Sequence, residues 1–262
     1  MAHDEDTSSS EPKPLRDYMR EIESHPGRIS ERKWRSLQMM CRLFEANLAE
    51  LKSLFKWASA TENTLELVQN VQPSSVREEF WFHLIRLSHN YLAAVSSLID
   101  HTRNLLKDYA DSPLEVEYNT RKGALIASGC AAFLKNLRNY MMHYNVPPFS
   151  FRWTVNNTAE GQISKTDILI DRLTLNDWSG WSAGARLFIA SKEGDLILEE
   201  VVDEYALLIR GIYSWLLDQY HRVHAVEIDE VNDLIAEMNS IYRLDSIPEV
   251  SLGNPATHTT SD

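Results

Sequence analysis

The chain has 262 residues, and 44% of them are hydrophobic, which is enough for one large core. Its formal net charge of -12 disfavours indiscriminate binding to nucleic acid or anionic lipid, so a polyanion partner would require a local basic site. Its two cysteines form neither a CxxC pair nor a Cys/His cluster. We therefore predict no disulfide framework, no zinc site and no cofactor.

The two ends of the sequence are polar. Residues 1–14 are acidic and rich in Ser and Pro, without the apolar segment of a signal peptide, and we expect a disordered tail. Residues 246–262 are expected to form a second flexible tail. No apolar run approaches the roughly 18 residues that a membrane span requires. We therefore expect a cytoplasmic protein without a membrane partner.

Three segments in the first half of the chain carry apolar residues at spacings of three and four, the pattern of amphipathic helices. They cover residues 30–60, 74–109 and 113–144, and the last is predicted to be one uninterrupted helix. Val146-Pro147-Pro148 should end it, because proline cannot continue a helix. Long helices of this kind usually pair along their length, which predicts a bundle.

The spacing of apolar residues changes after these helices. Apolar and polar residues alternate from Phe149 to Val155, which predicts a β-strand. A turn-rich segment and an apolar segment at 168–173 follow, so we expect one β-hairpin over about residues 149–175.

The helical spacing then returns. A short helix should end near Ser191, a long one should begin at Gly194, and a separate last helix should cover 229–242. The expected fold is mainly α, a helical bundle of about five to six helices with the inserted hairpin, in a single domain over residues 15–245.

One window of the sequence is distinguished by its charge. No Asp or Glu occurs from Tyr118 to Ala159, although the whole chain has 38 acidic residues. This window is the part of the chain best suited to a polyanion. Its cations are Arg121, Lys122, Lys135, Arg138 and Arg152.

The outer face of the helix at the centre of this window is expected to carry Arg138, Asn139 and His143. Metal-free RNA cleavage requires a proton acceptor for the 2′-hydroxyl, a proton donor for the leaving oxygen and a cation for the charge on phosphorus. Histidine can transfer protons near neutral pH, and arginine binds phosphate oxygens. One His cannot easily make both transfers, so a two-fold dimer would supply the second.

The segment from Arg138 to His143 resembles the R-x4-H motif of HEPN-domain proteins, in which a polar residue often follows the arginine. The resemblance implies a homodimeric helical bundle and a metal-independent endoribonuclease of a toxin–antitoxin, abortive-infection or antiviral system. Arg and His of both protomers would form one composite site, with RNA as substrate and a 2′,3′-cyclic phosphate as product. A partner protein, such as an antitoxin, is also implied. The motif covers six residues and does not account for the hairpin or the C-terminal helices.

This interpretation gives roles to individual residues. Arg138 and His143 would be catalytic, and Asn139 would orient the phosphate or His143. The cations that would bind the RNA backbone are Lys135, Arg121, Lys122 and Arg152. On the preceding helix, Asp100 and His101 could approach the polar face and support the site.

Other pairs in the chain have the same or a similar spacing. Arg20 and His25 lie in a polar segment before Pro-Gly, and Arg77 and His83 lie beside two glutamates, which is a poor environment for phosphate. Two alternatives to catalysis stay open. The helix end could be an ordinary solvated face, or the protein could be a non-catalytic scaffold or sensor that binds a protein or nucleotide. In the scaffold, the Arg138 and His143 end would be covered, or would lie apart from that of a second copy.

Some toxins of this family carry a tyrosine two residues after the histidine, and a partner nucleotidyltransferase modifies it. Here Asn145 occupies that position, and the neighbouring Tyr144 is expected to face the core. We therefore do not expect adenylylation at that place.

Overall fold

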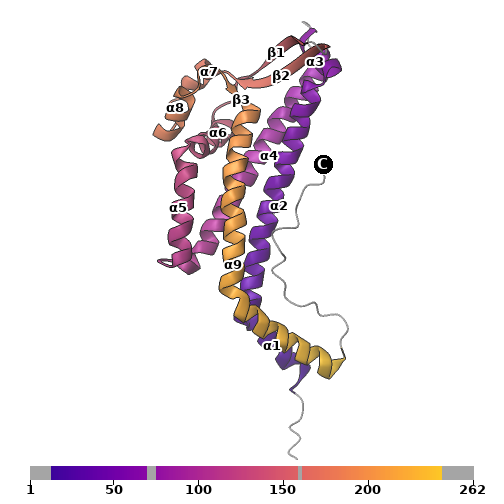
Figure 1. The fold of residues 1–262 in the computed structure, drawn as a ribbon, viewed down its shortest axis with the longest axis vertical. Helices are drawn as coiled ribbons and strands as arrows, with labels where there is room; N and C mark the ends of the chain where they lie inside the picture. The colour runs from indigo at the N-terminus through magenta and orange to yellow at the C-terminus, as the bar shows by residue number, and fades with distance from the viewer. Residues whose placement is uncertain (1–12, 70–74, 159–160, 244–262) are drawn as a thin grey trace, which may run out of the picture. The chain divides into compact units, whose positions relative to one another are not determined.

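The computed structural model describes residues 13–69, 75–158 and 161–243 (Figure 1). These residues form nine α-helices, a short 3-10 helix and a three-stranded antiparallel sheet. The expected mainly α class is confirmed. Nearly all residues of the two expected tails lie outside the described ranges. No helix in those ranges is both long enough and apolar enough to cross a membrane.

The described chain divides into two compact units. One consists of residues 37–216, and the other combines residues 13–36 with residues 217–243. The division falls inside α2 (Pro26–Ser59) and inside α9 (Leu198–Tyr242). The expectation of a single domain over residues 15–245 stays a prediction.

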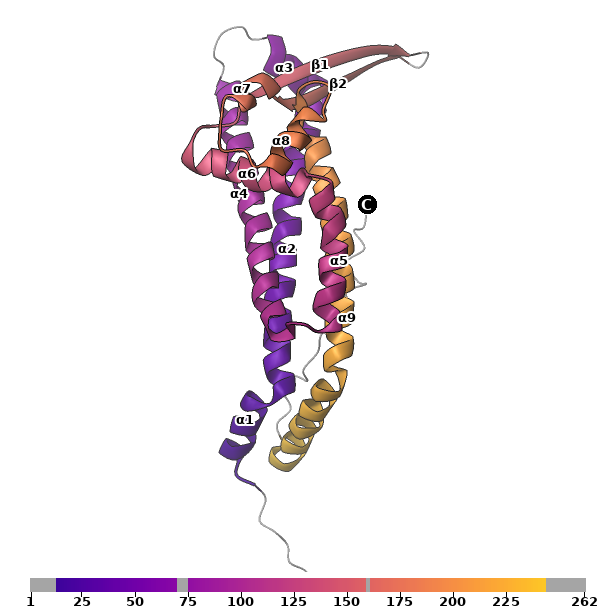
Figure 2. The same ribbon diagram turned by 90° about the vertical axis from the view of Figure 1, so that its left-hand side faces the viewer.

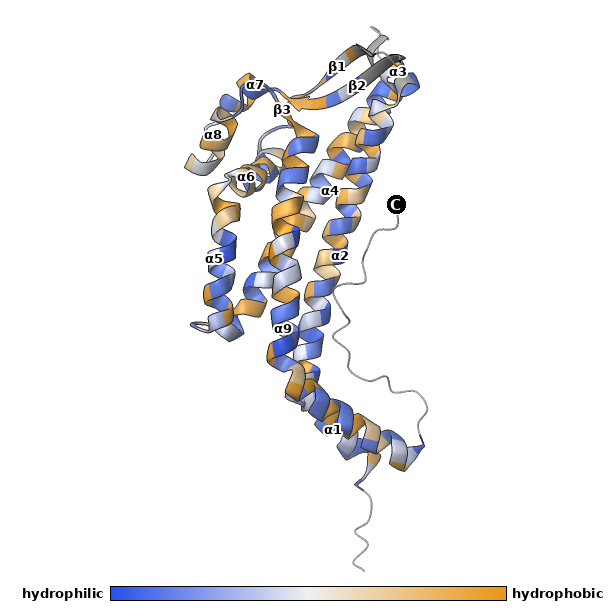
Figure 3. Ribbon diagram, in the orientation of Figure 1, coloured by the Kyte–Doolittle hydropathy of each residue, from blue (hydrophilic) through white to orange (hydrophobic). Residues whose placement is uncertain are grey.

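A bundle of four long helices forms the body of the 37–216 unit. α2, α4 (Ser75–Leu106), α5 (Pro113–Ala127) and α9 lie side by side and alternate in direction along the chain (Figures 1 and 2). Hydrophobic positions recur along each helix between hydrophilic ones, as expected for helices that bury one stripe (Figure 3). In the core, the ring of Phe44 lies 5.7 Å from that of Tyr91 and 6.3 Å from that of Tyr205.

The expected β-hairpin is present beside the bundle. β1 (Phe149–Thr158) pairs antiparallel with β2 (Gly161–Ile170), and the short β3 (Leu196–Ile197) extends the sheet along β2. Phe151 on β1 stacks on Trp81 of α4, with ring centroids 4.4 Å apart, and this contact holds the hairpin to the bundle. The second strand ends at Ile170, earlier than expected, because the side chain of Asp171 caps α7 (Arg172–Asn176). α3 (Thr61–Gln69) also contacts β2, through a 2.8 Å hydrogen bond between the hydroxyls of Thr64 and Thr166.

The expectation of one uninterrupted helix over residues 113–144 is wrong. α5 ends at Ala127, Gly129 adopts a left-handed conformation with φ of 72°, and α6 (Cys130–His143) begins in a new direction and crosses α4 (Figure 2). A β-carbon on Gly129 would lie 3.1 Å from Phe188 Cβ, because α8 (Ala183–Ala190) packs against the bend. The spacing of apolar residues continues across the bend, so the pattern did not reveal it.

Other helix boundaries also differ from expectation, which raises the number of helices in the described ranges to nine. α1 (Leu15–Ser24), α3 and α7 were not expected, and the 3-10 helix η1 (Lys107–Tyr109) follows α4. In contrast, the two last helices are one, because α9 is continuous from Leu198 to Tyr242. The segment between them, 224–228, contains no Gly or Pro, and its Ile228 is buried, so the helix has no reason to break there.

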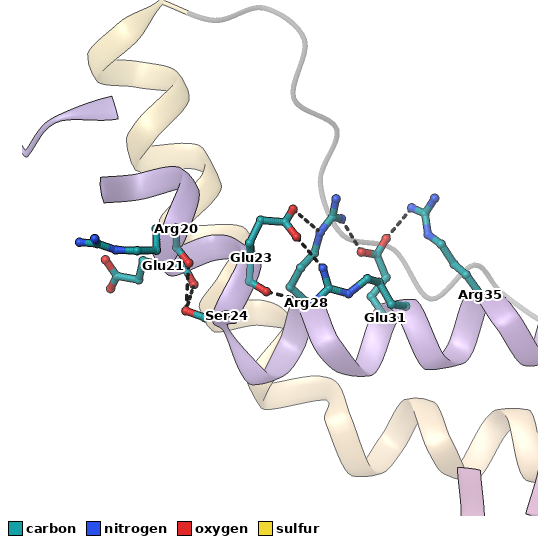
Figure 4. A network of polar contacts seen from close by, with 8 residues as sticks. Arg20, Glu21, Glu23, Ser24, Arg28, Glu31 and Arg35 are labelled. Carbon is teal, nitrogen blue, oxygen red and sulfur yellow. Dashed lines mark hydrogen bonds and ion pairs between the residues drawn. The ribbon is translucent and has the colours of Figure 1, made fainter. Parts of the chain in front are cut away.

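The second unit is held by buried aromatic rings and a charged network. Trp34 of α2 stacks on Tyr220 of α9, with centroids 5.7 Å apart and ring planes 13° apart. Glu31, with only 1% of its surface exposed, pairs with Arg28 and with Arg35, while Glu23 of α1 also reaches Arg28 (Figure 4). Because a buried carboxylate is costly without partners, this network fixes the corner between α1 and α2.

Candidate functional site

The C-terminal half of α6 has a buried face and a face open to solvent. Leu137 and Tyr140 are 1% exposed, while Lys135 and His143 are exposed. Arg138 is partly exposed, as is Asn139 next to it. The predicted exposure of this polar face is therefore confirmed for these residues.

Arg138 and His143 lie at the two edges of the open face. Five positions separate them, which places their side chains about 140° apart around the helix and roughly 7.5 Å apart along it. Asn139 lies between them, one helical turn before His143. No residue in the described ranges makes a hydrogen bond or ion pair with the side chain of Arg138, Asn139 or His143. Both the guanidinium and the imidazole are thus available to a ligand.

The buried face of α6 is fixed by the segment before α8. Asn136 is buried, and its side-chain oxygen accepts a 2.5 Å hydrogen bond from the backbone N–H of Ser182. Trp181 stacks on both Phe133 and Tyr140, with ring centroids 5.6 and 5.9 Å away. These contacts give α6 a defined orientation, and hence a defined direction to Arg138 and His143.

Tyr144 does not face the core as expected. Its exposed fraction is 55%, and its ring lies against Trp178, with centroids 6.1 Å apart. α6 ends at His143, and the φ and ψ of Tyr144, -126° and -67°, turn the chain out of the helix. The helical spacing that placed Tyr144 inside therefore no longer applies at that residue.

The remaining cations of the acid-free window are not gathered at this face. Arg121 pairs with Glu117 at 2.9 Å and lies over the ring of Trp215 at 4.6 Å. Lys122, like Arg121, belongs to α5, which runs along the bundle while α6 crosses α4 (Figure 2). The bend at Gly129 thus separates these two side chains from Arg138.

Arg152 is engaged within the hairpin. Its guanidinium makes a 2.7 Å ion pair with the buried carboxylate of Asp167, which Lys165 also contacts at 2.8 Å. The guanidinium of Arg152 is therefore already paired with a buried carboxylate.

The expected supporting residues on α4 lie away from the end of α6. One contact between the two helices is made by His89, whose Nε2 lies 2.9 Å from Met142 Sδ. Asp100 is roughly 16 Å further along α4 at 1.5 Å per residue, and it pairs with Arg103 at 3.1 Å. His101 follows Asp100 on the same turn. The structure does not bring this pair to Arg138 or His143.

A different part of α4, which was not expected at the site, lies beside α6. Arg86, His89 and Asn90 line a cavity together with Met141 of α6. They belong to a second stretch without Asp or Glu, from Phe80 to Ile99. The absence of Asp and Glu from this stretch could be seen in the sequence. Only the fold shows that the two acid-free segments lie against each other.

The other Arg/His pairs are less available than Arg138 and His143. Arg20 donates to Asp17 at 3.1 Å, and Arg77 donates to the backbone oxygen of Leu67 at 3.1 Å. His83 contacts Glu79 at 3.0 Å. Carboxylates or backbone groups already occupy these side chains, which supports the preference for the pair on α6.

Neither cysteine is suited to act as a nucleophile. Burial raises the pKa of the Cys41 thiol to about 12 and that of the Cys130 thiol to about 12, so both are protonated near neutral pH. Cys130 is buried and donates to the backbone oxygen of Val201 at 3.4 Å. Across the described ranges, no three His, Cys, Asp or Glu side chains gather as metal ligands.

No protein-family model, no curated protein and no solved structure matches this chain.

Proposed function

We propose that this chain is a metal-independent endoribonuclease of HEPN type that acts in the cytoplasm as a component of a toxin–antitoxin or antiphage system. The observation that supports it is the open face at the end of α6. Arg138 and His143 flank this face, and no carboxylate among the described residues neutralises either of them. A site for a phosphodiester needs such an unpaired cation and an accessible imidazole.

The reaction is an internal transfer at phosphorus. A base takes the proton of the 2′-hydroxyl, the 2′-oxygen forms a bond to phosphorus, and the bond from phosphorus to the 5′-oxygen breaks. An acid then gives a proton to the leaving 5′-oxygen. The products are a 2′,3′-cyclic phosphate and a 5′-hydroxyl, and no water is consumed. Arg138 stabilises the negative charge that grows on the phosphate oxygens during the transfer.

Two imidazoles are required because the base and the acid act on opposite sides of phosphorus. Each chain supplies one His143, so the proposal includes a two-fold homodimer in which two α6 ends meet. Asn139 lies one turn before His143 and would orient the imidazole or the phosphate. Lys135, on the same open face, would contact the RNA backbone. An antitoxin or other partner protein would regulate the site.

The test is a cleavage assay with single-stranded RNA in excess EDTA. His143→Ala and Arg138→Ala should each reduce the cleavage rate at least about 100-fold, the usual contribution of a proton-transfer group. His221→Ala and Arg103→Ala are matched controls on exposed helix positions and should cleave like the parent. A 2′-deoxy substitution at the cleaved position should block the reaction.

Equal rates for the parent and both α6 variants would refute the proposal. If the parent binds RNA or a protein but does not cleave RNA, the chain is instead a non-catalytic scaffold or sensor. Light scattering of the purified protein tests the dimer, since a monomer at the assay concentration would contradict the composite site.

A further inference from the structure

A small cavity lies between α4 and the C-terminal end of α6. Its volume is about 210 Å³. Phe82, Arg86, His89 and Asn90 line it from α4, and Met141 lines it from α6. Pockets for drug-sized ligands begin at roughly 300 Å³. This cavity is smaller, and it therefore suits one flat ring better than a whole nucleotide.

Phe82 offers an unused aromatic surface at the edge of this cavity. Its exposed fraction is 60%. Among the described rings, only His83 approaches it, in an edge-on contact with centroids 5.8 Å apart. Much of the Phe82 ring is therefore open to solvent and can stack on a ligand. Aromatic side chains of this kind are the usual platforms for unpaired bases in single-stranded nucleic acids.

Polar groups follow Phe82 on the same side of α4. Arg86 and Asn90 come four and eight positions later, so the three side chains share one helix face. In the described parts of the chain, no residue makes a hydrogen bond with the side-chain amide of Asn90. An amide has both donors and an acceptor, which is the combination required to read the edge of a base.

The charge of the side chains around the cavity is suited to a phosphate group. Both walls of the cavity come from stretches that contain no Asp or Glu, Phe80 to Ile99 and Tyr118 to Ala159. Arg86 therefore faces α6 without a carboxylate from either wall to neutralise it. In a chain of net charge -12, this juxtaposition is a local exception.

The cavity is also next to the proposed catalytic face. His89 Nε2 lies 2.9 Å from Met142 Sδ at the boundary between the two helices. Arg138 precedes Met142 by one helical turn, or roughly 6 Å. A ring bound in the cavity would thus hold its attached phosphate within the reach of the Arg138 side chain.

We propose that this cavity is a nucleobase subsite for single-stranded RNA. Phe82 stacks on the base, Asn90 contacts its edge, and Arg86 binds the adjoining phosphate. The inference rests on the proposed ribonuclease function, and it adds that the substrate is unpaired at the subsite. In a duplex, stacking neighbours cover both faces of each base, so Phe82 would find no free surface.

The test is fluorescence anisotropy of a short labelled single-stranded RNA and of the same RNA in a duplex, in EDTA. Every protein carries His143→Ala so that the RNA stays intact. Adding Phe82→Ala should raise the Kd for the single strand roughly 5- to 100-fold, as expected for loss of one stacked base, while Phe82→Trp should retain tight binding. Leu207→Ala, which is 74% exposed on α9 in the parent, is the matched control and should leave the Kd unchanged.

The outcomes of these experiments distinguish failure of the proposed subsite from failure of the proposed ribonuclease function. With His143 present, Phe82→Ala should raise KM for single-stranded RNA and largely retain kcat. If the parent cleaves RNA but Phe82→Ala leaves both Kd and KM unchanged, the subsite is wrong and the ribonuclease stands. Duplex binding as tight as single-strand binding would also overturn the subsite. A parent that neither binds nor cleaves RNA would overturn both.

Discussion

Replacement of Gly129 by alanine tests the bend that separates α5 from α6. Gly129 has a φ of 72°, a conformation that residues with a β-carbon rarely adopt. The added carbon would also lie 3.1 Å from Phe188 Cβ and 3.2 Å from the backbone oxygen of Gly184. The oxygen belongs to the backbone of α8 and cannot rotate away.

The expected loss of stability follows from the left-handed conformation and the close contacts, less a gain from the unfolded chain. A left-handed conformation costs an L residue roughly 1–2 kcal/mol. Overpacking adds about 1–3 kcal/mol, and the reduced freedom of the unfolded chain returns about 0.4–1 kcal/mol. Gly129→Ala should therefore lower the free energy of unfolding by about 1–4.5 kcal/mol.

Gly123→Ala is the matched control, because Gly123 lies inside α5 and its added β-carbon would meet no atom within 4 Å. This change should stabilise the protein by about 0.5–1 kcal/mol through helix propensity. Urea unfolding followed by circular dichroism measures both free energies. If residues 113–144 formed one continuous helix, both changes would be stabilising. A Gly129→Ala protein as stable as the parent would therefore refute the bend.

Two further changes test buried polar contacts by the same unfolding measurement. Burial opposes ionisation of Asp167, but hydrogen bonds from Lys165 and Arg152 outweigh it and lower its pKa. The stabilisation is therefore complete above the ordinary Asp pKa of about 3.9 and is lost as the pH falls through the lower folded value. Asp167→Asn should cost about 1–3 kcal/mol near neutral pH and reduce the loss of stability in acid; an unchanged acid dependence would contradict the pairing. Asn136→Ala should cost about 1–3 kcal/mol, because the backbone N–H of Ser182 loses its acceptor, and a variant as stable as the parent would count against that bond.

Much of the fold could be predicted because its signals are local. Apolar spacing located α4 closely, and the alternation from Phe149 located β1. The bend at Gly129 could not be predicted in this way. A single glycine inside a helical pattern is tolerated in many helices, and here the approach of α8 decides its conformation.

The candidate site, like the fold, could be predicted from the sequence only in part. The absence of acids around Arg138 and the spacing to His143 are properties of the sequence, and they led to the open face of α6. Arg121 and Arg152 belong to the same acid-free window, but the bend and the ion pair with Asp167 direct them elsewhere. Proximity in sequence was therefore a poor guide to which cations act together.

Local patterns in the sequence were sufficient to predict a mainly helical chain with one hairpin and one acid-free segment carrying Arg138 and His143. Periodicity and charge depend on near neighbours, so one chain is sufficient to show them. Tertiary packing, in contrast, makes α6 turn at Gly129 and lie against the acid-free part of α4, so that Phe82 and Asn90 line one cavity with Met141. That arrangement depends on packing between segments far apart in the chain, which no local pattern records.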